Sequence, residues 1–498
     1  MNLSEKSGWS IVNTYEKLPK KFYSKVKNAN FLNPKLILYN ESLAKTLGID
    51  EEIEKLSEDE KAEIFVGNKP IKHTKPIAQA YAGHQFGHFT ILGDGRAMLI
   101  AEQQALDGKI YDLHLKGSGT TPYSRGGDGK AVIKPMLREY LISEAMHYLG
   151  ISTTRSLAVS LTGEEIYRNG MEQGAVLARV ASSHLRVGTF EFASLNEKED
   201  LKKLANYAIK RHYGEILTQN EENIYTKLLQ NVIEKQANLI AKWQLVGFIH
   251  GVMNTDNMTI SGESIDYGPC AFMNEYDVNT VFSSIDRNGR YAYGNQPSIG
   301  QWNLSKFADT LLPLIHKDED MAVKIATKAL SKYSLKFNKA FISGMKAKIG
   351  LLNNEDDYLE LIQNLLTMMQ EMGADYTNTF VRLTLKMGGK DGSYLQGTKE
   401  LFDSSKFKIW QKKWLENINS SKIDKKQIFE NMKKANPFII PRNNIVEDVL
   451  KKASSGNFEE FNNFLNALKN PYEYKDKNKN YQELPPKTMQ KYQTFCGT

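Results

Sequence analysis

The chain has 498 residues, of which 41% are hydrophobic and 25% are charged, and its formal net charge is +7. This composition is typical of a water-soluble globular protein, and the even spread of Lys along the chain disfavours a nucleic-acid-binding surface. No apolar run approaches the roughly 18 residues that a membrane span requires, the N-terminus lacks a secretory signal, and the low cysteine content favours the reducing cytoplasm.

The first 72 residues are expected to form an N-terminal extension of short helical segments without a catalytic pattern. Within it, residues 40–49 (NESLAKTLGI) predict a helix that ends at Gly48. Farther along, two apolar runs flank Gly93-Asp94-Gly95, and this pattern predicts a β-hairpin whose turn is the glycine-rich segment.

The following segments alternate between strands and one helix. Residues 110–116 (IYDLHLK) alternate apolar and polar side chains and predict a strand that ends at Lys116. A helix is expected from Pro135 to Gly150, because proline favours the first turn of a helix and glycine its end. Two further strands are expected, near 156–162 and near 174–180.

From about residue 200 the pattern becomes helical. Apolar residues at one-turn spacing predict a helix over 224–246, and residues 301–385 are again mostly helical. Residues 471–487 are polar and contain proline, which predicts an extended tail. The pattern indicates an α+β, bilobal fold with four expected units: an N-terminal extension (1–72), a strand-rich lobe (73–190), a helical lobe (191–430) and a C-terminal extension (431–498).

The segment from His250 to Pro269 (HGVMNTDNMTISGESIDYGP) is similar to the metal-binding end of a protein-kinase site. Asn257 and Asp266 supply oxygen ligands suited to Mg²⁺ or Mn²⁺, although Asn and Asp also favour turns. The kinase pattern places its catalytic Asp five residues before the metal-binding Asn, but Val252 occupies that position here. Asp256, the only carboxylate adjacent to Asn257, is therefore the candidate general base.

Three earlier features agree with a kinase-like nucleotide site. The glycines of Gly93-Asp94-Gly95-Arg96 would let the backbone approach phosphates closely. Lys116 lies on a predicted strand and Glu139 on the predicted helix after it, and kinases hold nucleotide phosphates with such a Lys–Glu pair. A Lys–Glu pair alone would more often be surface charge, but the order of the motifs favours the nucleotide site.

The loop from Gly117 to Lys130 ends in Gly-Lys, as a P-loop does. It departs from that motif because Ser124 and Ala131 stand where the P-loop requires Gly and a Ser or Thr. Asp128 and Gly129 remain candidates to line a nucleotide site.

His84 and His88 have the i, i+4 spacing of a zinc-binding helix. Gln85 replaces the Glu of that motif, and the neighbouring glycines weaken a helix, so structural histidines are expected instead.

Arginine is unevenly distributed. Seven of the twelve arginines fall between residues 96 and 186, namely Arg96, Arg125, Arg138, Arg155, Arg168, Arg179 and Arg186. Arg binds phosphate bidentately and keeps its charge, so this part of the chain is a candidate anion site. Chance clustering and structural salt bridges account for some of the seven.

Together these residues resemble the selenoprotein O family, which has a protein-kinase-like fold. The resemblance extends from about Gly83 to Pro313 and rests on long motifs in a fixed order, among them YAGHQFGHF, LGDGRA, HLKGSGTTPYSRGGDGKAV, LARVASSHLRVGTFE, HGVMNTDNM and IDYGPCAFM. Such motifs are far more specific than a kinase signature alone.

The resemblance implies a protein adenylyltransferase that transfers AMP from ATP to Ser, Thr or Tyr hydroxyls of proteins; uridylylation is also associated with some members. It implies a nucleotide reversed relative to a kinase, with its α-phosphorus facing the attacking hydroxyl and pyrophosphate leaving. It further implies that Lys116 contacts phosphates and pairs with Glu139, that Asp256 is the base, and that Asn257 and Asp266 bind the metal. The other implied nucleotide-binding residues are Gly93, Gly95, Arg96, Asp128, Gly129, Arg179 and Arg186, of which the two last hold phosphate.

Some members of the family carry selenocysteine third from the C-terminus, where this chain has Cys496. The other cysteine, Cys270, lies four residues after Asp266. We hypothesise that the tail folds back and that the two cysteines form a regulatory disulfide; two free thiols are the alternative.

The prediction is thus a monomeric pseudokinase-like protein adenylyltransferase that uses ATP and Mg²⁺ or Mn²⁺, with no nucleic-acid or membrane partner. Three alternatives stay open: a uridylyltransferase that uses UTP, a kinase that transfers the γ-phosphate, and a catalytically inactive nucleotide-binding scaffold. The last is disfavoured because Lys116, Asp256, Asn257 and Asp266 are all present.

Overall fold

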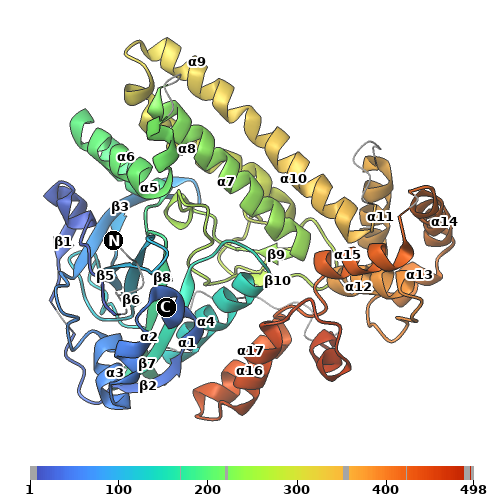
Figure 1. The fold of residues 1–498 in the computed structure, drawn as a ribbon, viewed down its shortest axis with the longest axis horizontal. Coiled ribbons are helices and arrows are strands. Elements are labelled where there is room, and N and C mark those ends of the chain that lie inside the picture. Colours follow the sequence, from blue (N-terminus) through green and yellow to red (C-terminus); the bar gives the residue numbers. More distant parts are fainter. Residues whose placement is uncertain are drawn as a thin grey trace.

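The computed structural model describes residues 8–27, 29–168, 170–218, 223–351, 358–421, 423–486 and 494. In these ranges an antiparallel sheet forms the N-terminal part of the chain, and helices dominate the remainder (Figure 1). The arrangement confirms the expected α+β class and is consistent with a kinase-like bilobal fold.

The sheet has eight strands, each antiparallel to its neighbours, in the order β1-β3-β5-β6-β8-β7-β2, and β4 pairs with β3. The strands are β1 (Tyr23–Lys25), β2 (Lys35–Tyr39), β3 (Ile77–Gln85), β4 (His88–Gly93), β5 (Ala97–Gln104), β6 (Ile110–Lys116), β7 (Arg155–Tyr167) and β8 (Met171–Ala181). A separate short pair joins β9 (Phe248–Ile249) to β10 (Ala271–Phe272). The predicted strands 110–116, 156–162 and 174–180 are confirmed within β6, β7 and β8. Strands β1 and β2 lie in the segment that was expected to hold only short helical pieces.

The prediction of a hairpin at Gly93-Asp94-Gly95 is wrong. The hairpin turn lies earlier, at Phe86-Gly87, where both residues have positive φ (50° and 89°) and connect β3 to β4. Strands β4 and β5 are both antiparallel to β3, so they run in the same direction beside it. The glycine-rich segment between them interrupts this run without reversing it. The Asp94 side chain stabilises this interruption by accepting a hydrogen bond from the Gln79 backbone N–H (2.9 Å).

The helices of the N-terminal part are α1 (Glu41–Leu47), α2 (Asp50–Glu54), α3 (Glu58–Val66) and α4 (Ile133–Tyr148). The predicted helix over 40–49 is confirmed as α1, which is capped by the Asn40 side chain and ends at the left-handed Gly48. The helix expected from Pro135 to Gly150 is α4, and Pro135 lies in its first turn, where a missing N–H costs nothing.

The remaining helices form the larger, helical part of the molecule. They are α5 (Val187–Ser194), α6 (Lys198–His212), α7 (Ile224–Val246), α8 (Gln296–Ile315), α9 (Glu319–Leu330), α10 (Lys332–Lys348), α11 (Leu359–Glu371), α12 (Tyr376–Met387), α13 (Lys399–Asp403), α14 (Ser405–Ser420), α15 (Lys425–Ala435), α16 (Asn443–Ser454) and α17 (Glu459–Leu468). Helix α7 has the predicted bounds 224–246 and packs against α8 and α10, while α16 and α17 pack on α4 (Figure 1). None of the helices in the described ranges is long and apolar enough to cross a bilayer.

The prediction of an extended tail over 471–487 is wrong for part of that segment. Residues Asp476–Gln482 form a 3-10 helix, and the buried Gln482 side chain donates to the carbonyl of Phe438 (2.9 Å). A polar composition therefore does not exclude regular structure here, because the polar side chains bond to backbone groups of the neighbouring segment.

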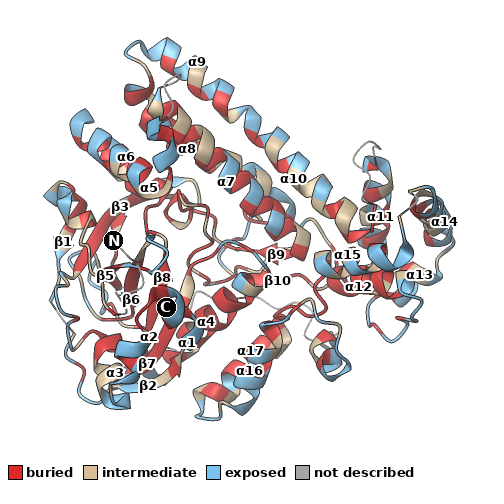
Figure 2. Ribbon diagram, in the orientation of Figure 1, coloured by how far each residue is buried: buried red, intermediate tan, exposed pale blue. Residues whose placement is uncertain are grey.

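The two faces of the sheet pack against different helices. Along β8, Val176 and Ala178 belong to the apolar cluster with α1–α3, whereas Ala175 and Leu177 belong to the cluster with α4 and α7. Figure 2 shows that the central strands and α4 are largely buried. Arg179 follows Ala178, so the alternation turns its side chain toward α4, which carries Glu139.

Candidate active site

A cleft of about 1150 Å³ lies between the sheet and the helical part. Twelve of the fourteen predicted site residues line it: Gly93, Gly95, Arg96, Lys116, Asp128, Gly129, Glu139, Arg179, Arg186, Asp256, Asn257 and Asp266. Of the other two, Cys270 is buried, and Cys496 lies outside the described residues. The residues that line the cleft come from both parts of the fold, so the fold is what brings together motifs that are far apart in the sequence.

The expected pair between a strand lysine and a helix glutamate is present. Lys116 is the last residue of β6, and its Nζ lies 2.7 Å from Oε2 of Glu139 on α4. Both side chains are buried. Burial alone would lower the pKa of Lys116, but the charges of Glu139 and Asp266 raise it, so the ammonium stays charged.

Asp266 is the centre of a cluster of cations. Its Oδ1 accepts from Lys116 Nζ (3.0 Å) and from Arg179 Nη1 (2.6 Å), and its Oδ2 lies 3.6 Å from Arg186 Nη1. Burial would raise the pKa of this carboxyl, but the three cations hold the pKa well below its usual range. Asp266 also has a left-handed backbone (φ 59°), which is rare for a residue other than glycine.

Arg179 is held from behind by two stacked histidines. Its Nε donates to Nε2 of His184 (3.3 Å), its Nη2 lies 3.5 Å from Nδ1 of His114, and the two imidazole rings are 3.8 Å apart. The contact with His184 needs a ring nitrogen that accepts, and this fits a neutral His184 whose Nδ1 faces Asp112, while Nε2 of His114 faces Asp94. Burial, with the nearby cations, keeps the pKa of His184 well below its usual value.

Arg186 directly precedes helix α5 and connects the cation cluster to the candidate base. Its Nη1 donates to the backbone carbonyl of Asp256 (3.1 Å), and its Nη2 lies 3.8 Å from Asp94. The guanidinium also stacks on Tyr81, 4.5 Å from the centre of that ring.

Asp256 lies in a short 3-10 turn, η5 (Thr255–Asn257), and is buried at the cleft. Gln85 Nε2 is 3.4 Å from its Oδ2, and its Oδ1 has no hydrogen-bond partner within the described part of the chain. Burial raises the pKa of this carboxyl to about 6, although the charge of Arg186 opposes the shift. A buried carboxylate with a raised pKa and a free oxygen is the kind of group that accepts a proton in catalysis.

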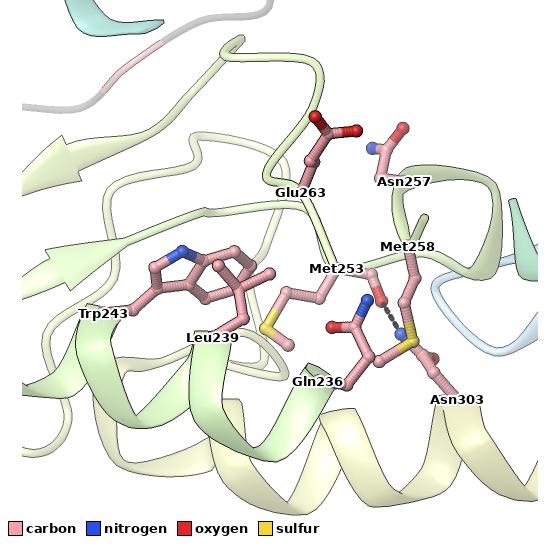
Figure 3. Close-up of a pocket in the computed structure, with 8 residues that line it drawn as sticks. All are labelled: Gln236, Leu239, Trp243, Met253, Asn257, Met258, Glu263 and Asn303. Carbon is pink, nitrogen blue, oxygen red and sulfur yellow. Dashed lines mark hydrogen bonds between the residues drawn. The ribbon is translucent and has the colours of Figure 1, made fainter. Parts of the chain in front are cut away.

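Asn257 is oriented by its amide. Its Nδ2 donates to the carbonyl of Val252 (3.0 Å), which leaves its Oδ1 as the atom available to a ligand. Asn257 also lines a cavity of about 10 Å³, together with Gln236, Leu239 and Trp243 from α7 (Figure 3).

The donor set fits a hard divalent cation. Asn257 supplies a carboxamide oxygen and Asp266 a carboxylate, and no group of three His, Cys, Asp or Glu that could hold a metal occurs in the described ranges. Mg²⁺ is commonly bound by one or two such protein oxygens together with phosphate oxygens and waters. Asn257 and Asp266 would therefore hold the metal together with a bound nucleotide.

The glycine-rich segment is shaped by a second loop. A β-carbon at Gly93 would lie 2.4 Å from the Tyr123 ring, and one at Gly95 would lie 2.7 Å from the Tyr123 carbonyl. Gly129 has φ 65°, and a β-carbon there would lie 2.1 Å from the carbonyl of Gly119. Gly93 and Gly95 thus allow the two loops to pack at the rim of the cleft, and Gly129 allows the second loop to close on itself.

Several residues of the cleft were not singled out from the sequence. Gln85, Phe86 and Tyr123 lie within motifs of the resemblance but were given no role, and Thr494 lies in no motif; their place in the cleft follows from long-range contacts. Arg125 belongs to the arginine-rich region and could have been singled out there. His84 fits the structural role expected of it, because its ring pairs with Glu191 and its backbone N–H donates to Thr255 Oγ1 (2.7 Å).

Cys270 follows the Asp266 loop, and burial raises the pKa of its thiol to about 11. Thr494 places one residue of the C-terminal segment beside this loop, because its Oγ1 donates to the carbonyl of Pro269 (2.5 Å) and its N–H to that of Phe282 (2.8 Å). Cys496 is outside the described residues, so the disulfide remains a prediction.

The chain is similar to known proteins over nearly its whole length. A family model described as protein adenylyltransferase SelO matches residues 8–469. A protein of Clostridium perfringens (strain SM101 / Type A) named protein nucleotidyltransferase YdiU is 53% identical over 498 residues, which are 100% of this chain and 99% of that protein. Proteins of the same name from Bacillus cereus (52% identical; 100% of each chain) and Brevibacillus brevis (53% identical; 99% of this chain and 98% of the other) are also similar.

Proposed function

The chain belongs to the protein adenylyltransferase SelO family and is a nucleotidyltransferase, and from this premise we propose that it transfers AMP from ATP to hydroxyl side chains of proteins. The hydroxyl oxygen of Ser, Thr or Tyr attacks the α-phosphorus, the bond to the β-phosphate oxygen breaks, and pyrophosphate leaves. The product is a phosphodiester between AMP and the protein.

The observation that carries this proposal is the position of the Asp256 carboxylate. Asp256 is buried at the cleft beside Asn257, whereas Val252 occupies the position of the kinase base. In this proposal the Asp256 carboxylate accepts the proton of the attacking hydroxyl. Its pKa of about 6 leaves it ionised at neutral pH, yet basic enough to take part in proton transfer.

The cations of the cleft supply the charge that phosphates require. In this proposal Lys116, Arg179 and Arg186 hold the phosphate groups, and Glu139 positions Lys116. Gly93, Gly95, Arg96, Asp128 and Gly129 line the remainder of the nucleotide site. Mg²⁺ or Mn²⁺, when held by Asn257 and Asp266, neutralises charge on the phosphate oxygens.

The test uses ATP labelled at either the α- or the γ-phosphate, with a bacterial lysate as the source of protein substrates. We expect label in protein from α-labelled ATP only. Asp256→Asn should lower the rate by about 10²–10⁴-fold, the usual contribution of a general base. Label from γ-labelled ATP alone would instead establish a kinase, and equal labelling by the variant would show that Asp256 is not the base.

Uridylyl transfer is the second candidate, since it is associated with some members of the family. Parallel reactions with ATP and UTP, followed by mass spectrometry of the modified proteins, distinguish the two because AMP and UMP differ in mass. A larger kcat/KM for UTP than for ATP would show that the chain is a uridylyltransferase. The proposed roles of the residues would be unchanged.

We further propose that the chain acts as a cytoplasmic monomer and that Cys270 and Cys496 form a disulfide that regulates it. The support is Thr494, which lies beside Pro269 and so places one residue of the C-terminal segment next to the loop that contains Cys270. Oxidant should lower the activity of the wild type but not that of Cys496→Ser. Equal inhibition of both proteins would refute the regulatory disulfide.

A further inference from the structure

Nine cationic side chains line the cleft: Arg96, Lys116, Arg125, Lys130, Lys134, Arg138, Arg168, Arg179 and Arg186. Seven of them face a carboxylate within 4 Å. The side chains of Arg96 and Arg125 are the two exceptions, because neither has a hydrogen bond or ion pair in the described part of the molecule. Both are exposed.

The backbone of Arg125 is in the left-handed region (φ 50°), as is that of the following Gly126 (φ 84°). The turn is closed by a hydrogen bond from the Gly127 N–H to the carbonyl of Ser124 (2.8 Å). Glycine or asparagine suits such a position, whereas the β-carbon of arginine disfavours it. Local propensity therefore does not explain an arginine here. Of the five non-glycine residues with positive φ in the described ranges, three (Phe86, Arg125 and Asp266) line the cleft.

The turn that carries Arg125 packs directly on the segment that carries Arg96. Ser124 Oγ donates to the carbonyl of Gly95 (2.5 Å), and a β-carbon at Gly95 would lie 3.3 Å from the Ser124 Cα. Two exposed guanidinium groups thus project from touching turns at one rim of the cleft. Like charges placed together repel, and an anion between them removes that repulsion.

Arginine recognises phosphate by paired, charge-assisted hydrogen bonds. We propose that Arg125, together with Arg96, binds the terminal phosphates of the nucleotide and thereby the departing pyrophosphate. This inference rests on the proposed nucleotidyl transfer and adds a residue to its nucleotide site. AMP lacks the phosphates that Arg125 would hold, so the contribution of Arg125 should depend on the length of the phosphate chain.

The test compares three proteins with the wild type by calorimetric titration with Mg-ATP, AMP and inorganic pyrophosphate. Arg125→Gly removes the side chain and relieves the left-handed backbone, whereas Arg125→Lys keeps the charge without the bidentate geometry. Lys328→Ala, which removes an exposed charge on α9 outside the cleft, is the control.

We expect Arg125→Gly to bind ATP and pyrophosphate about tenfold to hundredfold more weakly, the usual effect of losing hydrogen bonds to a charged group. AMP binding should be unchanged, Arg125→Lys should be intermediate, and Lys328→Ala should match the wild type. The unfolding temperature of Arg125→Gly should not fall, because glycine accepts φ 50° without strain.

Unchanged ATP affinity in Arg125→Gly would overturn the inference. So would an equal loss for ATP and AMP, which would indicate general damage to the site. If ATP affinity were unchanged and only the KM for protein substrate rose, Arg125 would bind an acidic group of the substrate instead. Failure of the wild type to transfer α-label would refute the proposed function, whereas the titrations report on Arg125 independently.

Discussion

A β-carbon at Gly83 would lie 2.4 Å from Oδ1 of Asp256, so the hairpin strand β3 and the candidate base are in direct contact. Real β-carbons do not approach oxygen this closely, and the carboxylate must move if residue 83 gains a side chain. Gly83 does not have a left-handed backbone, so a substitution there tests the contact rather than the backbone.

The first prediction is that Gly83→Ala lowers kcat by about 10²-fold, the effect expected when a catalytic group is displaced by about 1 Å. The KM for ATP should change little, because Arg186 bonds to the backbone carbonyl of Asp256 and not to the carboxylate that Gly83 contacts. Gly214→Ala is the matched control, since nothing lies within 4 Å of its β-carbon. An active Gly83→Ala enzyme would show that the carboxylate tolerates displacement.

The second prediction concerns the contact between the C-terminal helix α16 and α4. Arg138 donates to Glu447 (3.0 Å) and Asn443 (3.0 Å) on α16, and also to the carbonyl of Cys270 (2.6 Å). Glu447→Ala would leave the buried charge of Arg138 partly unpaired. Arg138 directly precedes Glu139, the partner of Lys116. We expect a loss of about 1–3 kcal/mol in the free energy of unfolding and a several-fold lower kcat.

Thermal unfolding and the rate of α-label transfer measure both effects. The control is Asp448→Asn on the same helix. Asp448 forms a surface ion pair with Lys452 (2.8 Å), and the loss of such a pair should change stability little. Destabilisation of Glu447→Ala with full activity would show that α16 supports the fold but does not position α4 for catalysis.

The third prediction separates the acceptor role of His184 from its bulk. Glutamine can present an oxygen where the Nε2 of His184 accepts from Arg179, whereas leucine cannot. We expect His184→Gln to retain most of the affinity for Mg-ATP, and His184→Leu to lose about tenfold because an Arg179 donor is left unpaired. The KM for Mg-ATP and kcat are measured for both variants. An equal loss of Mg-ATP affinity in the two variants would show that His184 has a packing role only.

The fourth prediction is a dependence of stability on pH that arises far from the cleft. Lys348 is buried, faces Phe380 with its Nζ 4.2 Å from the ring centre, and has no carboxylate partner in the described ranges. Burial lowers its pKa from the ordinary 10.5 to about 7. Between pH 7 and 10.5 the unfolded chain therefore binds more protons than the folded chain, and the contribution of Lys348 to stability rises with pH.

Lys348→Met removes this titration. We expect it to raise the free energy of unfolding by a few kcal/mol, on the order of 1.4 kcal/mol per unit of pKa shift, at pH 7 and below. The gain should shrink as the pH approaches 10. Chemical denaturation at about pH 6.5, 8 and 9.5 tests this, because these values span most of the interval between the two pKa values. The control is Lys339→Met, which replaces an exposed lysine on the same helix. A gain that does not change with pH would show that Lys348 is not the titrating group.

The features that could be predicted from the sequence are those encoded by neighbouring residues. The bounds of α7, the end of β6 at Lys116 and the end of α1 at Gly48 follow from periodicity and capping. The pairing of Lys116 with Glu139 could also be predicted, because the order of the kinase-like motifs along the chain favours it. The adjacency of Asp256 and Asn257 needs no tertiary information at all.

The features that could not be predicted depend on distant contacts. The hairpin turn contains Phe86 with φ 50°, which no local propensity favours. Its N–H donates to Asn254 (3.0 Å) and its ring packs on Tyr291, so distant residues stabilise a turn that the sequence pattern predicts nearer the glycines. For the same reason the contact of Gln85 with Asp256 has no signature in the sequence.

The salt bridges of Asp266 affect how a divalent cation and a polyphosphate would bind at this site. A divalent ion at this carboxylate would lie beside Lys116 and Arg179, whose charges oppose it. A polyphosphate offsets those charges but competes with Asp266 for the same donors. Each ligand therefore relieves the obstacle to the other, and linkage makes this effect mutual. Free Mg²⁺ and metal-free ATP should each bind weakly, and together they should bind with positive cooperativity.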